Sequence, residues 1–327
     1  MTKLSSGPRD ASAELLRILA AFFVVMIHVS ATETGIAIAY NAFARFSVPL
    51  FILLSGRFLL SKERSIPEVF RKGGRLLAMM VVWSALYYGF FTLMGSRPDL
   101  PIWKYLLTEP IHLWYLWAAA ALYLMTPVLY VFCSHASKEV YQYTLVGTFL
   151  LGSILFILLR SECFPLLAEI VDQAKLPYQL GFVFCFLLGD YTSRFPLKRP
   201  APVGWTLFLL ASLVNVGANL WLAETSVSTL LLSFFTPASL LAGAGLYWAV
   251  QGFALPGSTA KWVRSWSACT LGIYLAHPML LHLLTPWRSA LGLPAVVEVP
   301  LVTILVFALS SLLVFLFRKI FHSLSRT

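Results

Sequence analysis

The stretch that decides the fold is Glu14-Leu-Leu-Arg17-Ile-Leu-Ala-Ala-Phe-Phe-Val-Val-Met-Ile-His28, an apolar run with charged residues near its start and a histidine at its end. It belongs to a longer apolar segment, residues 15–34, which is long enough for a helix to cross about 30 Å of hydrocarbon. Ionisable residues inside a membrane are costly, and they usually face the interior of a helix bundle, where they have a partner and a function. We therefore predict that this segment is the first membrane span and that it carries part of a functional site.

Arg17 and His28 lie on one face of this predicted helix. They are eleven residues apart, which at about 100° per residue is about three turns plus 20°. Glu14 lies on the same stripe, one turn before Arg17. The rise of about 1.5 Å per residue puts His28 roughly 16 Å deeper than Arg17, near the middle of the bilayer. A neutral imidazole there could take a proton from a hydroxyl group; a core histidine that bonds a neighbouring helix is the alternative.

The rest of the chain is as apolar as this segment. Of its 327 residues, 59% are hydrophobic and 12% are charged, whereas soluble domains are about 45–50% apolar and about 25% charged. The sequence predicts an all-α, polytopic transmembrane helix bundle of about ten spans that forms one domain, residues 1–327. The candidate spans are residues 15–34, 41–60, 75–95, 112–133, 141–159, 177–191, 203–223, 228–250, 268–284 and 295–317.

Lys and Arg residues are distributed unevenly between alternate loops. If the N-terminus is cytoplasmic, the inner segments hold 16 of the 24 Lys and Arg residues and the outer segments hold 5. Cytoplasmic loops carry the excess of Lys and Arg in membrane proteins, so we predict that both termini are cytoplasmic. The net charge of +10 is then mostly a topology signal, and no nucleic-acid partner is expected. The four cysteines are scattered, which predicts no metal site.

Four motifs, in the same order along the chain, resemble those of the membrane-bound acyltransferase 3 family. The first is Arg17 and His28 with ten residues between them. The others are Arg45-Phe-Ser-Val-Pro-Leu-Phe-Ile-Leu-Leu-Ser-Gly56, His112-Leu-Trp-Tyr-Leu-Trp117 and Leu271-Gly-Ile-Tyr-Leu-Ala-His277-Pro278. The resemblance covers nearly the whole chain. Within the family, the chain is most similar to the short members of the enterobacterial common antigen O-acetyltransferase type.

The resemblance implies an O-acyltransferase, most simply an acetyl-CoA-dependent O-acetyltransferase, in the cytoplasmic (inner) membrane of a bacterium. Acyl-CoA would be the co-substrate, with no further cofactor, and the acceptor would be a hydroxyl of a cell-surface polysaccharide or its lipid-linked precursor. The matching residues imply that His28 is the general base and that Arg17 positions the donor or an intermediate. Glu14 stands where the family usually has Asp, which keeps the charge. Transfer could be direct or could pass through an acyl-histidine.

Basic residues near the cytoplasmic side are candidate ligands for the phosphates of acyl-CoA, because arginine can pair with phosphate through two N–H groups. Arg71 and Arg75 lie at the cytoplasmic start of the third span, and Arg57 lies in the cytoplasmic half of the second. Arg57 stands where the family usually has an aromatic residue. The alternative for all three is anchoring at the membrane surface.

Candidate ligands of the acceptor lie toward the outer side of the predicted bundle. Arginine could bind a phosphate or a sugar, and aromatic rings suit stacking on sugar faces, although interfacial anchoring is the alternative. The histidine that precedes Pro278 could instead belong to a helix kink. The candidate acceptor-binding residues are Arg45, His112, Trp114, Tyr115 and His277.

A proton-coupled transporter or flippase of a glycan lipid is the second functional hypothesis, with the buried charges as a proton relay. Such proteins often show an internal two-fold repeat and paired broken helices. We find no convincing repeat between residues 1–160 and 161–327. The charges within the spans concentrate in the first three, which favours one site and therefore the acyltransferase.

Overall fold

The computed structural model describes residues 10–31, 35–108, 112–155, 157, 180–223 and 231–324. The regular structure in these residues is helical and contains no strand, which confirms the predicted all-α fold. The elements are α1 (Ala11–Val29), α2 (Ile36–Ala44), α3 (Ser47–Leu59), α4 (Ile66–Leu93), α5 (Ile102–Thr108), α6 (Trp114–His135), α7 (Lys138–Phe149), the π-helical turn η1 (Leu150–Ile154), α10 (Leu180–Arg194), α11 (Pro200–Trp221), α13 (Pro237–Val250), α14 (Gly257–Ser267), α15 (Thr270–Leu291) and α16 (Ala295–Leu324).

Six segments of the described chain are long and apolar enough to cross a membrane, namely α1, α2 with α3, α4, α6, α11 and most of α16. A seventh is formed if α14 and α15, which are bent by 54° relative to each other, are counted as one span. These helices support a multi-pass membrane protein. The ten spans and the cytoplasmic termini stay predictions. The predicted spans 15–34, 141–159, 177–191 and 228–250 extend into residues outside the described ranges, as do both ends of the chain.

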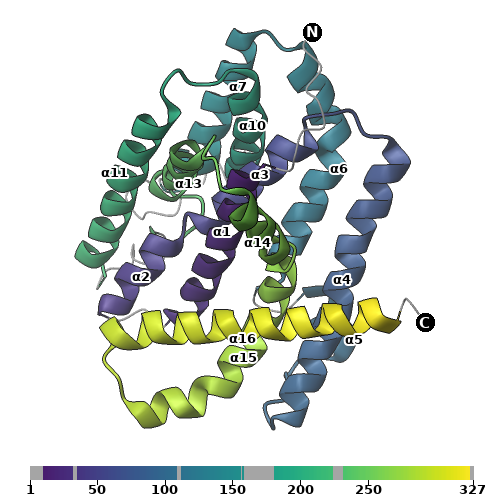
Figure 1. The fold of residues 1–327 in the computed structure, drawn as a ribbon, viewed down its shortest axis with the longest axis vertical. Helices are drawn as coiled ribbons and strands as arrows, with labels where there is room; N and C mark the ends of the chain where they lie inside the picture. Colours follow the sequence, from purple (N-terminus) through teal and green to yellow (C-terminus); the bar gives the residue numbers. More distant parts are fainter. Residues whose placement is uncertain are drawn as a thin grey trace, which may run out of the picture.

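Helix α1 is the central element of the bundle. The Asp10 carboxylate caps its start by accepting hydrogen bonds from the backbone N–H groups of Ser12 (3.1 Å) and Ala13 (3.3 Å). Helices α2, α3, α14, α15 and α16 all contact α1, and Figure 1 shows it in the middle of the molecule. Because other helices surround it, the polar stripe of α1 faces protein.

The second predicted span is interrupted in the structure. Residues 41–60 were expected to form one helix, but α2 ends at Ala44 and α3 begins at Ser47. Pro49 explains the break, because proline has no N–H to donate to the carbonyl four residues earlier and its ring crowds that carbonyl. The carbonyl in question belongs to Arg45, so the break falls at this candidate site residue.

Glycines let α3 and α10 approach each other closely. A Cβ atom added to Gly56 would overlap the backbone oxygen of Phe186, and one added to Gly189 would overlap the backbone oxygen of Leu53. Small residues allow membrane helices to pack backbone against backbone in this way. The contact holds α3 in place beside α1, with which it also packs.

Helix α16 runs across the bundle at a large angle to α4 and α6 (Figure 1). It contacts α1, α2 and α15. Val299, Val302 and Val306 are buried, whereas many other apolar side chains of the helix are exposed. Its buried face therefore packs against the C-terminal half of α1.

Candidate active site

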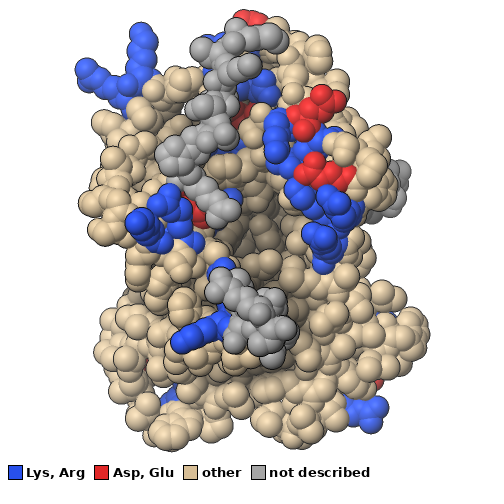
Figure 2. Space-filling model, turned by 45° about the vertical axis from the view of Figure 1, so that its right-hand side comes forward, with Lys and Arg blue, Asp and Glu red and all other residues tan. Residues whose placement is uncertain are grey.

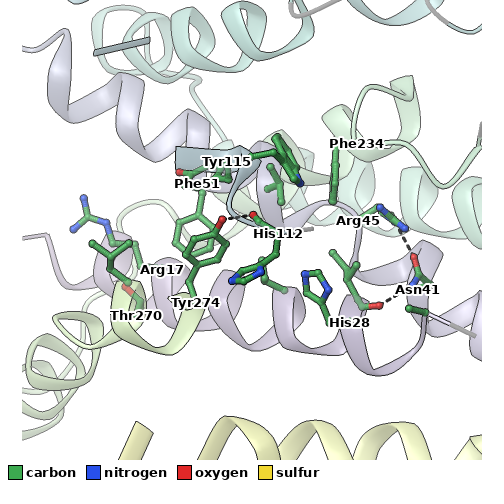
Figure 3. Close-up of a pocket in the computed structure, with 16 residues that line it drawn as sticks. Arg17, His28, Asn41, Arg45, Phe51, His112, Tyr115, Phe234, Thr270 and Tyr274 are labelled. Carbon is green, nitrogen blue, oxygen red and sulfur yellow. Dashed lines mark hydrogen bonds between the residues drawn. The ribbon is translucent and has the colours of Figure 1, made fainter. Parts of the chain in front are cut away.

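A cavity of about 350 Å³ lies beside α1, and we call it the histidine cavity (Figure 3). Its walls come from α1, from the α2–α3 break, from the start of α6 and from α15. Segments that are far apart in the sequence therefore meet around one space. Six of the candidate site residues line it, namely Arg17, His28, Arg45, His112, Trp114 and Tyr115.

Three histidines form a cluster at this cavity. The ring centroid of His28 lies 5.0 Å from that of His277 and 6.0 Å from that of His112, and the last two are 5.6 Å apart. His28 and His112 line the cavity, whereas His277 is fully buried (0% exposed) and does not. The sequence identified all three residues but assigned His112 and His277 to acceptor binding, without placing them beside His28.

His112 is held from two sides. Tyr274 donates its hydroxyl proton to the backbone oxygen of His112. Nε2 of the His112 ring lies 3.4 Å from the Tyr87 hydroxyl oxygen, which itself donates to the backbone oxygen of Leu275 at 2.8 Å. Helix α15 therefore helps to position His112, which lies just before the start of α6. Tyr274 lies within the fourth motif, but the sequence analysis did not single it out.

Arg45 is positioned by a neighbour that the sequence analysis also missed. Its Nε donates to Oδ1 of Asn41 at 2.8 Å, and its guanidinium lies over the Phe234 ring, 4.7 Å from the centroid. Nδ2 of Asn41 donates to the backbone oxygen of Ile27 at 2.9 Å. Asn41 therefore connects Arg45 to the turn of α1 that carries His28. The four-residue spacing of Asn41 and Arg45 on a helix is a signal that could have found the pair.

A second cavity, of about 640 Å³, lies at the N-terminal end of α1, and we call it the charged cavity. Figure 2 views a face of the molecule on which a hollow lies between groups of basic and acidic side chains. The charged residues that line the cavity are Asp10, Glu14, Arg17, Arg64, Lys72 and Arg264. Arg17 lines the histidine cavity as well, so its side chain stands where the two cavities meet.

Arg17 is held at this position by Glu14 and by an aromatic ring. Its Nη1 atom lies 3.2 Å from both carboxylate oxygens of Glu14, and its guanidinium lies over the Phe58 ring at 4.9 Å. The Glu14 carboxylate, which is buried, also accepts a hydrogen bond from the hydroxyl of Ser267 on α14. The pairing of Glu14 with Arg17 follows from their spacing, whereas nothing in the local sequence indicates Ser267.

The three arginines expected to bind phosphate do not line either cavity. Arg57 forms an ion pair with Asp10 (2.7 Å) and donates to the Tyr247 hydroxyl (2.9 Å). Burial disfavours the charged form of Asp10, but hydrogen bonds from Ser12 and the charge of Arg57 outweigh it and hold the pKa of this carboxyl below its usual value. Arg71 and Arg75 are exposed on α4.

Besides Arg17, the basic residues that line the charged cavity are Arg64, Lys72 and Arg264. Arg64 and Lys72 both contact the Glu68 carboxylate, at 3.0 and 2.6 Å, and Arg264 comes from α14. The spacing of Arg64, Glu68 and Lys72, four residues apart each time, is the sequence signal for this group. Arg264 has no such signal, because the fold brings α14 against α1.

One comparison with known protein families agrees with the four sequence motifs, the histidine cluster and the membrane-spanning helices. The family model described as an acyltransferase domain, of the acyltransferase 3 type, matches residues 10–317. The chain belongs to the acyltransferase 3 family. Comparisons with curated proteins and with solved structures found no match.

Membership of the acyltransferase 3 family makes the protein a membrane acyltransferase in the general sense. The two cavities belong to the part of the chain that the family model covers, since their lining residues lie between Asp10 and Tyr274. The more specific resemblance to the enterobacterial common antigen type has no support from a relative.

Proposed function

We propose that the protein is an integral membrane O-acyltransferase that transfers an acyl group, most simply acetyl, from acyl-CoA to a hydroxyl of a cell-surface polysaccharide or its lipid-linked precursor. The observation that carries this proposal is that Arg17 lines both cavities, one of which is rich in charge while the other holds His28. A donor in the charged cavity and an acceptor in the histidine cavity would meet in the region between Arg17 and His28. The bacterial inner membrane and the enterobacterial common antigen type are parts of the same proposal.

The charged cavity suits the phosphate groups of acyl-CoA. Arg64, Lys72 and Arg264 line it together with Arg17, and guanidinium groups bind phosphate oxygens through charge-assisted hydrogen bonds. Arg71 and Arg75, exposed on α4, would attract the anionic donor from solution rather than hold it. Arg57 would not contact the donor itself. It would hold Asp10, which lines the cavity and forms an ion pair with Arg57.

The histidine cavity suits a sugar that offers a hydroxyl group. Trp114 and Tyr115 present aromatic rings to it, and His112 and Arg45 add polar groups. Sugars bind proteins through such a combination of apolar ring faces and a few placed hydrogen-bonding groups. These four residues are therefore the proposed acceptor-binding residues.

The proposed reaction conserves all atoms and protons. A neutral ring nitrogen of His28 takes the proton of the acceptor hydroxyl while the hydroxyl oxygen attacks the thioester carbonyl carbon. A C–O bond forms and the C–S bond breaks, and the proton then passes from His28 to the departing thiolate of CoA. Arg17 would position the acyl-CoA donor where the two cavities meet, and Glu14 would hold Arg17 in place.

Replacing His28 tests the proposal. In membranes supplied with radiolabelled acetyl-CoA, His28→Ala should lower the incorporation of label into glycan by about 100-fold or more, since a positioned general base contributes about 10²–10⁴-fold. His135→Ala is the matched control, because His135 is exposed at the end of α6 and outside both cavities. Normal labelling by the His28 variant would rule out the base. Glycan-lipid movement that needs no acyl donor would favour the transporter.

A further inference from the structure

His277 is a buried polar group that the proposed reaction does not use. It lies on α15 with 0% of its surface exposed. Nδ1 of its ring is 3.1 Å from the backbone oxygen of Ile273, one helical turn earlier. Its Nε2 atom has no hydrogen-bond partner within the described residues. Leaving a buried acceptor or donor unpaired costs about 1–3 kcal/mol, so such an atom in a protein interior calls for an explanation.

The contact with Ile273 decides where the His277 proton lies. A carbonyl oxygen can only accept a hydrogen bond, so Nδ1 carries the proton in the neutral ring and Nε2 carries a lone pair. The unpaired atom is therefore an acceptor that needs an N–H donor. Among its ring neighbours, the closest imidazole is that of His28, at 5.0 Å between centroids.

The same reasoning applies to His112 and leaves His28 as the donor. The Tyr87 hydroxyl gives its proton to the backbone oxygen of Leu275, so the contact between this hydroxyl and Nε2 of His112 requires the proton on Nε2. His112 then directs its N–H away from the cluster. Among the three histidine rings, His28 is the one for which no neighbouring group determines which ring nitrogen carries the proton.

We propose that His277 is a positioning residue for the base: its Nε2 atom accepts the N–H of His28, so that the other ring nitrogen of His28 keeps its lone pair toward the histidine cavity. This inference rests on the proposed function. Two imidazoles joined by an N–H···N hydrogen bond of about 3 Å have centroids about 5 Å apart, which is the separation of these rings. Nε2 of His277 has no partner among the described residues, so the bond would form by reorientation of the His28 ring, and catalytic hydrogen bonds commonly tighten when substrate binds.

The arrangement gives His28 the two properties that a general base needs. The nitrogen that faces the cavity is unprotonated before the reaction, and the imidazolium formed when it takes the hydroxyl proton remains hydrogen-bonded on its far side. A base that is oriented by a third group is the usual arrangement for activating a weak nucleophile. His277 does this from behind the cavity wall, without touching either substrate.

Three variants of α15 test the proposal in membranes that transfer label from radiolabelled acetyl-CoA to glycan. His277→Phe should lower kcat by about 10-fold or more, as expected for a misoriented base, and should leave the KM for acetyl-CoA unchanged. His277→Gln should restore most of kcat, because its amide oxygen can accept the His28 N–H. His282→Phe, on the same helix and packed between Phe90 and Phe91, is the control and should behave as wild type.

Full kcat in His277→Phe would overturn the proposal, as would a Gln variant that is as impaired as the Phe variant. Nitrogen-15 NMR of histidine-labelled wild-type protein in lipid bilayers gives a readout that needs neither activity nor a stable variant. The proposal expects His277 to be protonated at Nδ1 with a hydrogen-bonded Nε2, and a signal from an unbonded Nε2 would overturn it. Wild-type membranes that label no glycan would instead refute the proposed function, while the NMR result would still decide the hydrogen bond.

Discussion

Arg264 shows at the residue scale how the fold changes an expectation drawn from sequence. The basic cluster at the start of α4 suggested Arg71 and Arg75 as phosphate ligands, yet Arg264, which is far along the chain, lines the charged cavity. A helical stripe predicts which residues of one helix share a face. It does not predict which residues of a distant helix will lie opposite them.

We predict that Arg264→Gln raises the KM for acetyl-CoA by about 10-fold with little change in kcat, because a charge-assisted hydrogen bond contributes about 1.5–3 kcal/mol. The measurement is the rate of label transfer as a function of acetyl-CoA concentration. Lys261→Gln is the control, since Lys261 is exposed on the same helix and lines neither cavity. An unchanged KM in the Arg264 variant would exclude the charged cavity as the phosphate site.

The central part of the site could be predicted from sequence because it lies on one helix. Arg17 and His28 share a stripe of α1 and line one cavity, as their spacing indicated. The histidine cluster could not be predicted, because His28, His112 and His277 belong to three segments whose contacts depend on tertiary packing. The hydrogen bond from Ser267 to Glu14, which joins residues 253 positions apart, could not be predicted for the same reason.

At the scale of elements, hydropathy located the helices better than it located their breaks. The apolar segment 41–60 corresponds to one candidate span, Ile36–Leu59, as predicted, but Pro49 causes a short break between α2 and α3 inside this span. Likewise, α14 and α15 meet at 54° near the start of the predicted span 268–284. Both breaks border the cavities, and Arg45 and Thr270 at these breaks line the histidine cavity.

The close contact of α3 and α10 makes a prediction about stability. Gly56→Ala should destabilise the protein by about 1–3 kcal/mol, the usual cost of overpacking, because the added methyl group meets the backbone of Phe186. Thermal unfolding in detergent, followed by loss of helical circular dichroism, measures the effect. Gly74→Ala is the matched control: it lies within α4 with open space around it, so alanine should be neutral or slightly stabilising. Equal stability of the two variants would contradict the packing argument.

At the scale of the whole molecule, the distribution of Lys and Arg predicts which ends of the helices face the cytoplasm. In protein in which Cys163 is replaced by Ser, the described cysteines that remain are buried. Ser134→Cys, at the end of α6, lies on the predicted cytoplasmic side. It should therefore not react with a membrane-impermeant maleimide added to spheroplasts. Ser96→Cys, after α4, should react. Both serines are exposed, so the reverse labelling pattern would overturn the predicted orientation.

The position of Arg17 has a consequence for the membrane itself. A protein with a polar space of about 640 Å³ and a second space of about 350 Å³ around one helix must still prevent protons and small ions from leaking across the bilayer. Since the Arg17 side chain lines both spaces, we expect it to separate one from the other. Glu14 holds the guanidinium at this position, and we expect the side chain to obstruct the passage of ions from one space to the other.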